Sequence, residues 1–225
     1  MIKRVFGDSL WKRHKTFVRW NFLSSVLGGW KYTLSTDSLL CVMNFDSPLL
    51  SGSVSFISKD LIGQLGTCFY AYRRDSSEGD RCTLTYGLNI NILLQCCIFL
   101  ENSTPFLPSY FYLPIASTSN IIKNISMVGM GAVNTNVIRE IANDRSSGDI
   151  IQSAELYSKI AAQNSTASSI GMAMGIATIV LIPSRTIRFL FVCPILSLSH
   201  YLAYKKSLTY IFRPCKNQKC CKSQY

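Results

Sequence analysis

The chain has 225 residues and a net charge of +11, and only 16% of its residues are charged. Its mean hydropathy is +0.20. Soluble domains carry about a quarter charged residues, so this composition argues against an ordinary water-soluble domain and favours a membrane protein or an obligate subunit of a complex. The basic residues gather near the two ends of the chain, which argues against nucleic acid as a partner and favours lipid headgroups beside an apolar middle.

The N-terminal segment, residues 1–23, is basic and nearly free of acids. It lacks the short apolar region and small-residue cleavage site of a secretory signal. Two interpretations remain open: a weak organelle-targeting segment, or a basic surface helix with Phe6, Leu10 and Phe17 on one side. This segment does not distinguish plastid, mitochondrion and cytosol.

Residues 51–69 predict an amphipathic helix, because their apolar side chains recur at helical spacing. Gly63 and Gly66 interrupt this pattern. Each glycine costs about 1 kcal/mol in a helix interior, so we expect both to allow close packing against a neighbour. The apolar positions are Val54, Ile57, Leu61, Leu65 and Phe69.

Residues 82–100 carry no charge but contain three amide side chains, at Asn89, Asn91 and Gln95. This stretch is marginal as a membrane span and fits a buried helix of a bundle better. Pro105 and Pro108 then predict a break, because proline cannot continue a helix interior. Residues 115–137 are again mostly apolar, with a single lysine at Lys123.

Residues 139–159 form a polar middle, which the turn signal at 146–148 divides. Residues 160–184 carry no charge and exceed the roughly 20 residues that cross a bilayer, so they predict the main transmembrane helix. Residues 189–204 are shorter, contain Pro194 and His200, and have basic residues on both sides. We therefore predict a re-entrant or interfacial run, with the C-terminal tail on the same side as Arg185, facing cytosol, stroma or matrix.

Gly171 and Gly175 form a small-xxx-small pattern inside the main apolar run and predict a helix-packing face. Metal and catalytic motifs are absent, and the two histidines, His14 and His200, have no motif around them. The tail cysteines Cys215, Cys220 and Cys221 lack a fourth metal ligand. They fit either palmitoylation or unmodified thiols.

Several local strings combine in a recognisable order. Residues 34–40 read LSTDSLL, and residues 56–66 place Lys59 and Asp60 ahead of two glycines. Lys159 and Gln163 then precede the glycine-containing helix at 170–176. In order and spacing, over roughly residues 24–184, the chain resembles the root UVB sensitive family.

This resemblance implies a membrane-associated, largely helical domain. Plant members are linked to UV-B sensing in roots, seedling development, auxin transport and vitamin B6 homoeostasis, and some act in plastids as a complex of two paralogues. No reaction is established for the family, so it supplies no catalytic residues. The chain departs from the family at Tyr86 and Ile90, where acidic residues are usual, in a longer loop at 142–158, and in its end soon after Ser207. These departures predict a divergent or truncated member.

We therefore predict an all-α, membrane-associated helical bundle with one transmembrane helix and further apolar, re-entrant or interfacial helices. Its parts are a basic segment (1–23), a helical domain (24–208) and a basic, cysteine-containing tail (209–225). The expected function is non-enzymatic binding of a partner or ligand, with no cofactor and no metal. The expected partners are membrane lipids and a paralogous or other protein, and the alternatives are a small-metabolite carrier or a soluble helical adaptor. The candidate binding residues are Lys59, Asp60, Lys159 and Gln163, and the candidate packing residues are Gly63, Gly66, Gly171 and Gly175.

Overall fold

The computed structural model of the chain describes residues 8–46, 49–73, 83–142 and 153–212, and every regular element in these residues is helical. The predicted all-α fold is therefore confirmed. The turn predicted at 146–148 and the tail cysteines lie outside the described residues. The long helices are α2 (Asp8–Asp46), α3 (Leu49–Arg73), α5 (Thr83–Ser103), α6 (Tyr112–Ala142), α7 (Ser153–Leu181) and α9 (Cys193–Phe212).

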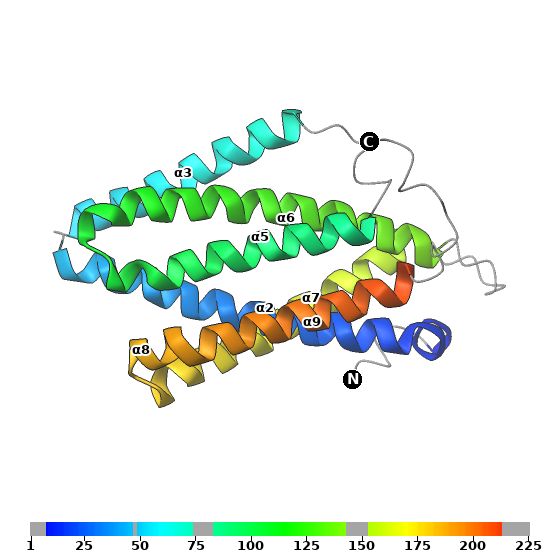
Figure 1. Ribbon diagram of the computed structural model, residues 1–225. Helices are drawn as coiled ribbons and strands as arrows, with labels where there is room; N and C mark the ends of the chain where they lie inside the picture. The colour runs from blue at the N-terminus through cyan, green and yellow to red at the C-terminus, as the bar shows by residue number, and fades with distance from the viewer. Residues whose placement is uncertain (1–7, 47–48, 74–82, 143–152, 213–225) are drawn as a thin grey trace.

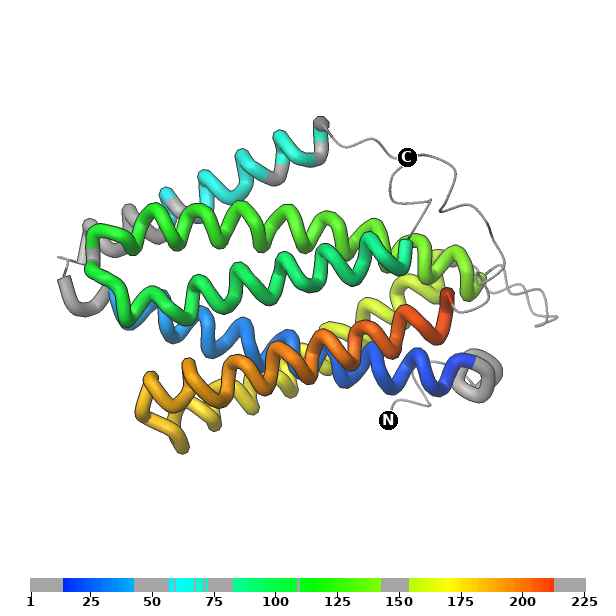
Figure 2. Tube along the Cα trace, viewed as in Figure 1, coloured from blue at the N-terminus to red at the C-terminus, as the bar shows by residue number. Residues whose placement is uncertain are grey.

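The helices form a layered bundle around α2 (Figures 1 and 2). Helices α7 and α9 pack against one side of α2, and α5 packs against α2 and α9. Helix α6 then covers α5, and α3 covers α6. Each long helix runs antiparallel to the one before it, so the chain crosses the length of the bundle repeatedly (Figure 1).

Glycines bring α2 and α7 into backbone contact. A side chain on Gly171 would overlap the carbonyl oxygen of Val26, and one on Gly29 would overlap the carbonyl oxygen of Ser168. A Cβ on Gly175 would lie 2.6 Å from Thr33 Cβ. Residues 171 and 175 therefore lie in the tightest interface of α7, where only the absence of a side chain permits this approach.

Helix α3 contains the predicted helix at 51–69 and extends it at both ends. Gly63 and Gly66 face α6, where added side chains would meet Asn120 and Ile121. The apolar stripe on the opposite face does not enter the core. Its side chains are 60–66% exposed, at Ile57, Leu61, Leu65 and Phe69.

The predicted proline break is confirmed between α5 and α6. Two short 3-10 turns, η1 (Thr104–Phe106) and η2 (Ser109–Phe111), reverse the chain there. Pro105 lies in the first turn of η1, where its missing N–H leaves no helical hydrogen bond unmade.

Three helical segments of the described chain are long and apolar enough to cross a membrane, whereas the sequence predicted one. They are Thr83–Phe106, Ala154–Leu181 and Arg185–Phe212, and the second contains most of the predicted span at 160–184.

The run at 189–204 belongs to the last segment, which joins α8 (Arg185–Ile187), the π-helical turn η3 (Arg188–Val192) and α9. Its 28 residues cover about 40 Å as a helix. Arg185 and Phe212 therefore lie at opposite ends of the bundle, not on one side as a re-entrant run would place them (Figure 1). Pro194 does not break this segment, because it lies in the first turn of α9, directly after the π-helical turn.

Candidate functional site: a polar interior and an adjoining cavity

Polar side chains line the inner faces of α2 and α5. On α2, Lys31, Ser35 and Ser38 are spaced so that they share one helix face. On α5, Asn91 and Asn102 are buried, and Gln95 lies between them. The two faces meet inside the bundle, so its interior is more polar than the sequence suggested.

Lys31 is only 1% exposed and joins three helices. Its Nζ donates to Gln95 Oε1 on α5 and lies 2.7 Å from His200 Nδ1 on α9. Gln95 Nε2 lies 2.8 Å from the same Nδ1 and donates to Asn91 Oδ1 at 3.1 Å. Because Lys31 fixes the orientation of the Gln95 amide, His200 Nδ1 accepts from two donors and the imidazole proton resides on Nε2.

Desolvation changes the acidity of Lys31, which lies on α2 and not on one of the three apolar segments. Burial lowers the pKa of its ammonium from 10.5 to about 7, and the nearby Cys97 and Cys193 thiols oppose this shift. The two atoms that bind Nζ, Gln95 Oε1 and His200 Nδ1, belong to neutral side chains. Lys31 can therefore lose its proton near neutral pH.

A second cluster surrounds Glu101, whose side chain is completely buried. Lys123 Nζ of α6 lies 2.8 Å from Glu101 Oε1, and Ser119 Oγ donates to the same oxygen at 3.1 Å. Ser35 of α2 donates to Oε2. This carboxylate of α5 is thus bound from both α2 and α6 and ties the three helices together.

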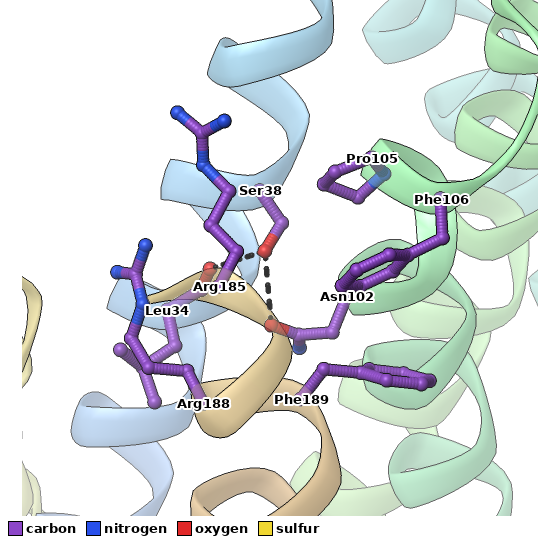
Figure 3. Close-up of a pocket in the computed structure, with 8 residues that line it drawn as sticks. All are labelled: Leu34, Ser38, Asn102, Pro105, Phe106, Arg185, Arg188 and Phe189. Carbon is purple, nitrogen blue, oxygen red and sulfur yellow. Dashed lines mark hydrogen bonds between the residues drawn. The ribbon is translucent and has the colours of Figure 1, made fainter. Parts of the chain in front are cut away.

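A third cluster lies near α8, where Figure 3 shows a small cavity between α2, η1 and η3. Ser38 Oγ donates to Asn102 Oδ1 at 3.1 Å, and Arg188 Nη1 forms an ion pair with Asp37 Oδ2 at 2.9 Å. Phe189 stacks near Phe106, with ring centroids 5.1 Å apart. The cavity measures about 10 Å³, which holds about one water molecule, so it cannot hold a metabolite.

A larger cavity of about 290 Å³ lies beside the Lys31 cluster. Five helices line it, and it is open toward the surface of the bundle. Uncharged polar side chains of α2, α6, α7 and α9 contribute to the lining, but most of the exposed lining area is apolar. Asn21 Nδ2 of α2 donates to Asn164 Oδ1 of α7 at 2.7 Å, which holds this wall in place. The lining residues include no charged side chain: Asn21, Ser24, Ser25, Gly28, Gly29, Tyr32, Leu94, Met127, Met130, Gly131, Asn134, Asn164, Ser168, His200 and Tyr204.

Two polar groups of this wall have no hydrogen-bond partner among the described residues. One is the buried hydroxyl of Tyr204. The other is Nε2 of His200, because both contacts of that ring use Nδ1. Gly28 leaves Nε2 accessible, since a Cβ there would lie 3.8 Å from it. The cavity wall therefore offers His200 Nε2 as a hydrogen-bonding group that the protein itself does not use, whereas the Tyr204 hydroxyl is enclosed by protein atoms.

The candidate residues predicted from sequence do not form one site. The side chain of Lys59 lies outside the described part of the chain, and Asp60 accepts a hydrogen bond from Asn120 at 3.3 Å. Lys159 pairs with Glu155 at 2.5 Å on the surface of α7, whereas Gln163 is buried and donates to Val18 O at 3.0 Å. Figure 1 places α3 and α7 on opposite sides of the bundle, so the two pairs are far apart.

The two positions that depart from the family pattern are both packed in the bundle. Ile90 is part of the buried core of α5. Tyr86 lies 3.0 Å from Tyr70, hydroxyl to hydroxyl. In the described residues, no group of three or more histidine, cysteine, aspartate or glutamate side chains could hold a metal ion.

The sequence of the chain is similar to one known protein family and to two plant proteins. The family model described as "Vitamin B6 photo-protection and homoeostasis domain" matches residues 4–217. Protein root UVB sensitive 4 of Arabidopsis thaliana is 29% identical over 144 residues, which cover 63% of this chain and 27% of that protein. Protein root UVB sensitive 6 of the same plant is 23% identical over 173 residues, covering 76% and 34%. The chain thus spans about a third or less of the length of these relatives. No solved structure matches it.

Proposed function

This chain belongs to the root UVB sensitive family, whose domain is described as one of vitamin B6 photo-protection and homoeostasis, and we propose that it is a membrane-embedded, non-enzymatic protein that binds a small polar metabolite of the vitamin B6 class. The family resemblance carried by the ordered sequence strings is thereby confirmed. One observation carries the proposal: an open cavity of about 290 Å³, lined by apolar and uncharged polar side chains, lies between the helices of a bundle whose outer surface is apolar.

The apolar outer surface supports the membrane part of the proposal. Only 22% of the most apolar window of Ala154–Leu181 is buried inside the bundle, and only 28% of that of Arg185–Phe212. In water, exposure of this surface would cost a free energy of about 25 cal/mol per Å² of apolar area. Monomeric soluble proteins rarely expose large apolar patches. The outward side chains include Ile170, Ile176, Val180 and Leu181 on α7, Leu190 and Phe191 on η3, and Ile195 and Leu198 on α9.

The two ends of the bundle support contact with lipid headgroups. Lys15, Arg19 and Lys205 are exposed toward one end, where Lys206 Nζ also lies 4.3 Å from the centroid of the Trp20 ring. Aromatic side chains are exposed at the other end, beside η2, at Tyr110 and Phe111. Basic and aromatic residues at the ends of an apolar layer are typical of membrane interfaces.

The exposed apolar stripe of α3 supports a protein partner within the membrane. This stripe (Ile57, Leu61, Leu65 and Phe69) follows one face of a helix that contacts the bundle through α6. A paralogous chain or another apolar helix would cover it, as the family resemblance implies. Cross-linking through a cysteine at Leu65 would capture such a partner, whereas cross-linking only to lipid would refute it.

Two experiments test the proposed function. Carbonate extraction of membranes from cells that express the chain should leave it in the pellet, and release into the soluble fraction would refute membrane embedding and favour the soluble adaptor. Equilibrium dialysis of the detergent-purified chain against pyridoxine and pyridoxal should show saturable binding. If no vitamer of the class binds, the ligand part of the proposal is wrong.

A carrier for the same ligand is the second candidate, and the buried ionisable side chains favour it. Along α2, Lys31 is followed by Ser35, which binds Glu101, and then by Asp37, which pairs with Arg188 near α8. Ionisable groups inside apolar helices often mark a substrate or proton path. Uptake of pyridoxal into vesicles that contain the chain, above uptake into empty vesicles, would favour the carrier, and binding without uptake would favour the binding protein.

A further inference from the structure

We infer that the 290 Å³ cavity selects the unphosphorylated, net-uncharged form of its ligand and rejects the phosphate ester. This inference rests on the proposed function and adds the chemical form of the ligand to it. Three features of the structure support it: the absence of charge in the cavity lining, the binding of the buried cations to other groups, and the hydrogen-bonding groups of the wall.

The lining carries no charge to balance a phosphate. A phosphate monoester bears about −1.5 to −2 charges at neutral pH. Contact between the phosphate and this uncharged, mostly apolar lining displaces water from an anion without supplying a cation, which is unfavourable unless the charge is paired. Pyridoxine and pyridoxal carry no net charge near neutral pH, so they avoid this penalty.

The buried cations Lys31 and Arg188 bind other groups of the protein. Lys31 lies behind the wall, is 1% exposed, and its Nζ is already bound to Gln95 and His200. Arg188 pairs with Asp37 near α8, beside the smaller cavity and not the larger one. Recruiting Lys31 to a phosphate would break both of its hydrogen bonds and leave Gln95 Oε1 without its donor inside the bundle.

The unused groups of the wall match a small hydroxylated ring. His200 Nε2–H is a donor at the wall and can bind a ring oxygen or an aldehyde oxygen of the ligand. Tyr204 also lines the cavity, but its hydroxyl is buried without a partner in the described protein and does not reach a ligand there. Leu94, Met127 and Met130 supply an apolar surface for the face of the ring.

The first test compares three compounds on the full chain purified in detergent: pyridoxine, pyridoxal and pyridoxal 5′-phosphate. Isothermal titration should show binding of the two unphosphorylated compounds and at least tenfold weaker binding of the ester. Equal or tighter binding of the ester would overturn the inference and leave the proposed function intact. If none of the three binds, the proposed function fails and the inference fails with it.

The second test uses two variants that should not disturb the fold. Gly28→Ala adds a methyl at an ordinary 3.8 Å from His200 Nε2, and Tyr204→Phe removes a hydroxyl that has no partner. Both should retain the wild-type melting temperature or raise it. Gly28→Ala should weaken pyridoxal binding about three- to tenfold, the loss of about one hydrogen bond to His200, whereas Tyr204→Phe removes an enclosed hydroxyl and should weaken it less.

Ser169→Ala is the matched control, because that hydroxyl bonds its own helix at Ser165 O and does not line the cavity. The control should bind pyridoxal as wild type does. If Gly28→Ala and Tyr204→Phe also bind as wild type, the ligand lies elsewhere and the inference is overturned.

Discussion

Removal of Lys123 should destabilise the bundle by exposing the cost of the buried Glu101 carboxylate. Breaking a buried ion pair by removing one partner costs about 3 to 5 kcal/mol. Lys123 keeps 21% of its side chain exposed whereas Glu101 keeps none, so we expect Lys123→Met to cost about 2 to 3 kcal/mol. For a chain of this size, that loss lowers the melting temperature by about 4 to 12 °C. Thermal unfolding in detergent, followed by circular dichroism, measures it.

Lys159→Met is the matched control, because Lys159 pairs with Glu155 on the surface, with the two side chains 32% and 56% exposed. It should cost less than about 0.5 kcal/mol. The double variant Glu101→Gln, Lys123→Met should recover part of the loss, since the neutral amide oxygen can accept from one of Ser35 and Ser119 and the amide NH2 can donate to the hydroxyl oxygen of the other. If Lys123→Met and Lys159→Met melt at the same temperature, water solvates Glu101 and the reasoning is refuted.

Two further predictions concern stability. In the unfolded chain Lys31 keeps its proton up to about pH 10.5, whereas in the folded protein it releases the proton above about pH 7. Raising the pH from 7 to 9 should therefore stabilise the wild type by about 2 kcal/mol relative to Lys31→Met. Parallel pH profiles of the free energy of unfolding for the two proteins would contradict this. Gly171→Ala should destabilise by about 1 to 3 kcal/mol, because its methyl overlaps the carbonyl oxygen of Val26. In the control Gly131→Ala, the added methyl meets no atom within 4 Å, so this variant should be neutral or stabilising by up to about 1 kcal/mol. Equal melting temperatures of the two alanine variants would show that α2 and α7 pack less closely than the structure indicates.

Local patterns predicted the helices well, because their causes are local. The apolar spacing at 51–69 and the prolines Pro105 and Pro108 each act within one or two turns, and the structure has a helix and a break there. The number of apolar segments was underestimated for a tertiary reason. Asn91 and Gln95 made 82–100 look marginal as a span, yet they turn inward and bond each other, and Gln95 binds Lys31, 64 positions away.

The candidate site could not be assembled from sequence for the same reason. His200 and Lys31 are 169 positions apart, and no local pattern joins them. A usable signal did exist: Lys31, Glu101 and Lys123 are each isolated ionisable residues in mostly apolar stretches, and such residues turn inward and pair when the surroundings are lipid. The family strings drew attention to Lys59 and Lys159 instead. Lys159 lies on the surface of α7, and the side chain of Lys59 is outside the described part of the chain.

A polar interior and an apolar exterior are the arrangement expected of a helical bundle in a bilayer, as we propose for this chain. Lipid removes the hydrophobic force that drives helices together in water, so close packing and internal hydrogen bonds must hold the bundle. Gly29 and Gly171 supply the close packing between α2 and α7, and the bonds of Lys31 and Glu101 join α2 to α5, α6 and α9. Replacing water by lipid also weakens the hydrophobic force that would otherwise fill a cavity with apolar side chains. A cavity of about 290 Å³ can therefore stay open beside His200, where a ligand could take the place of water.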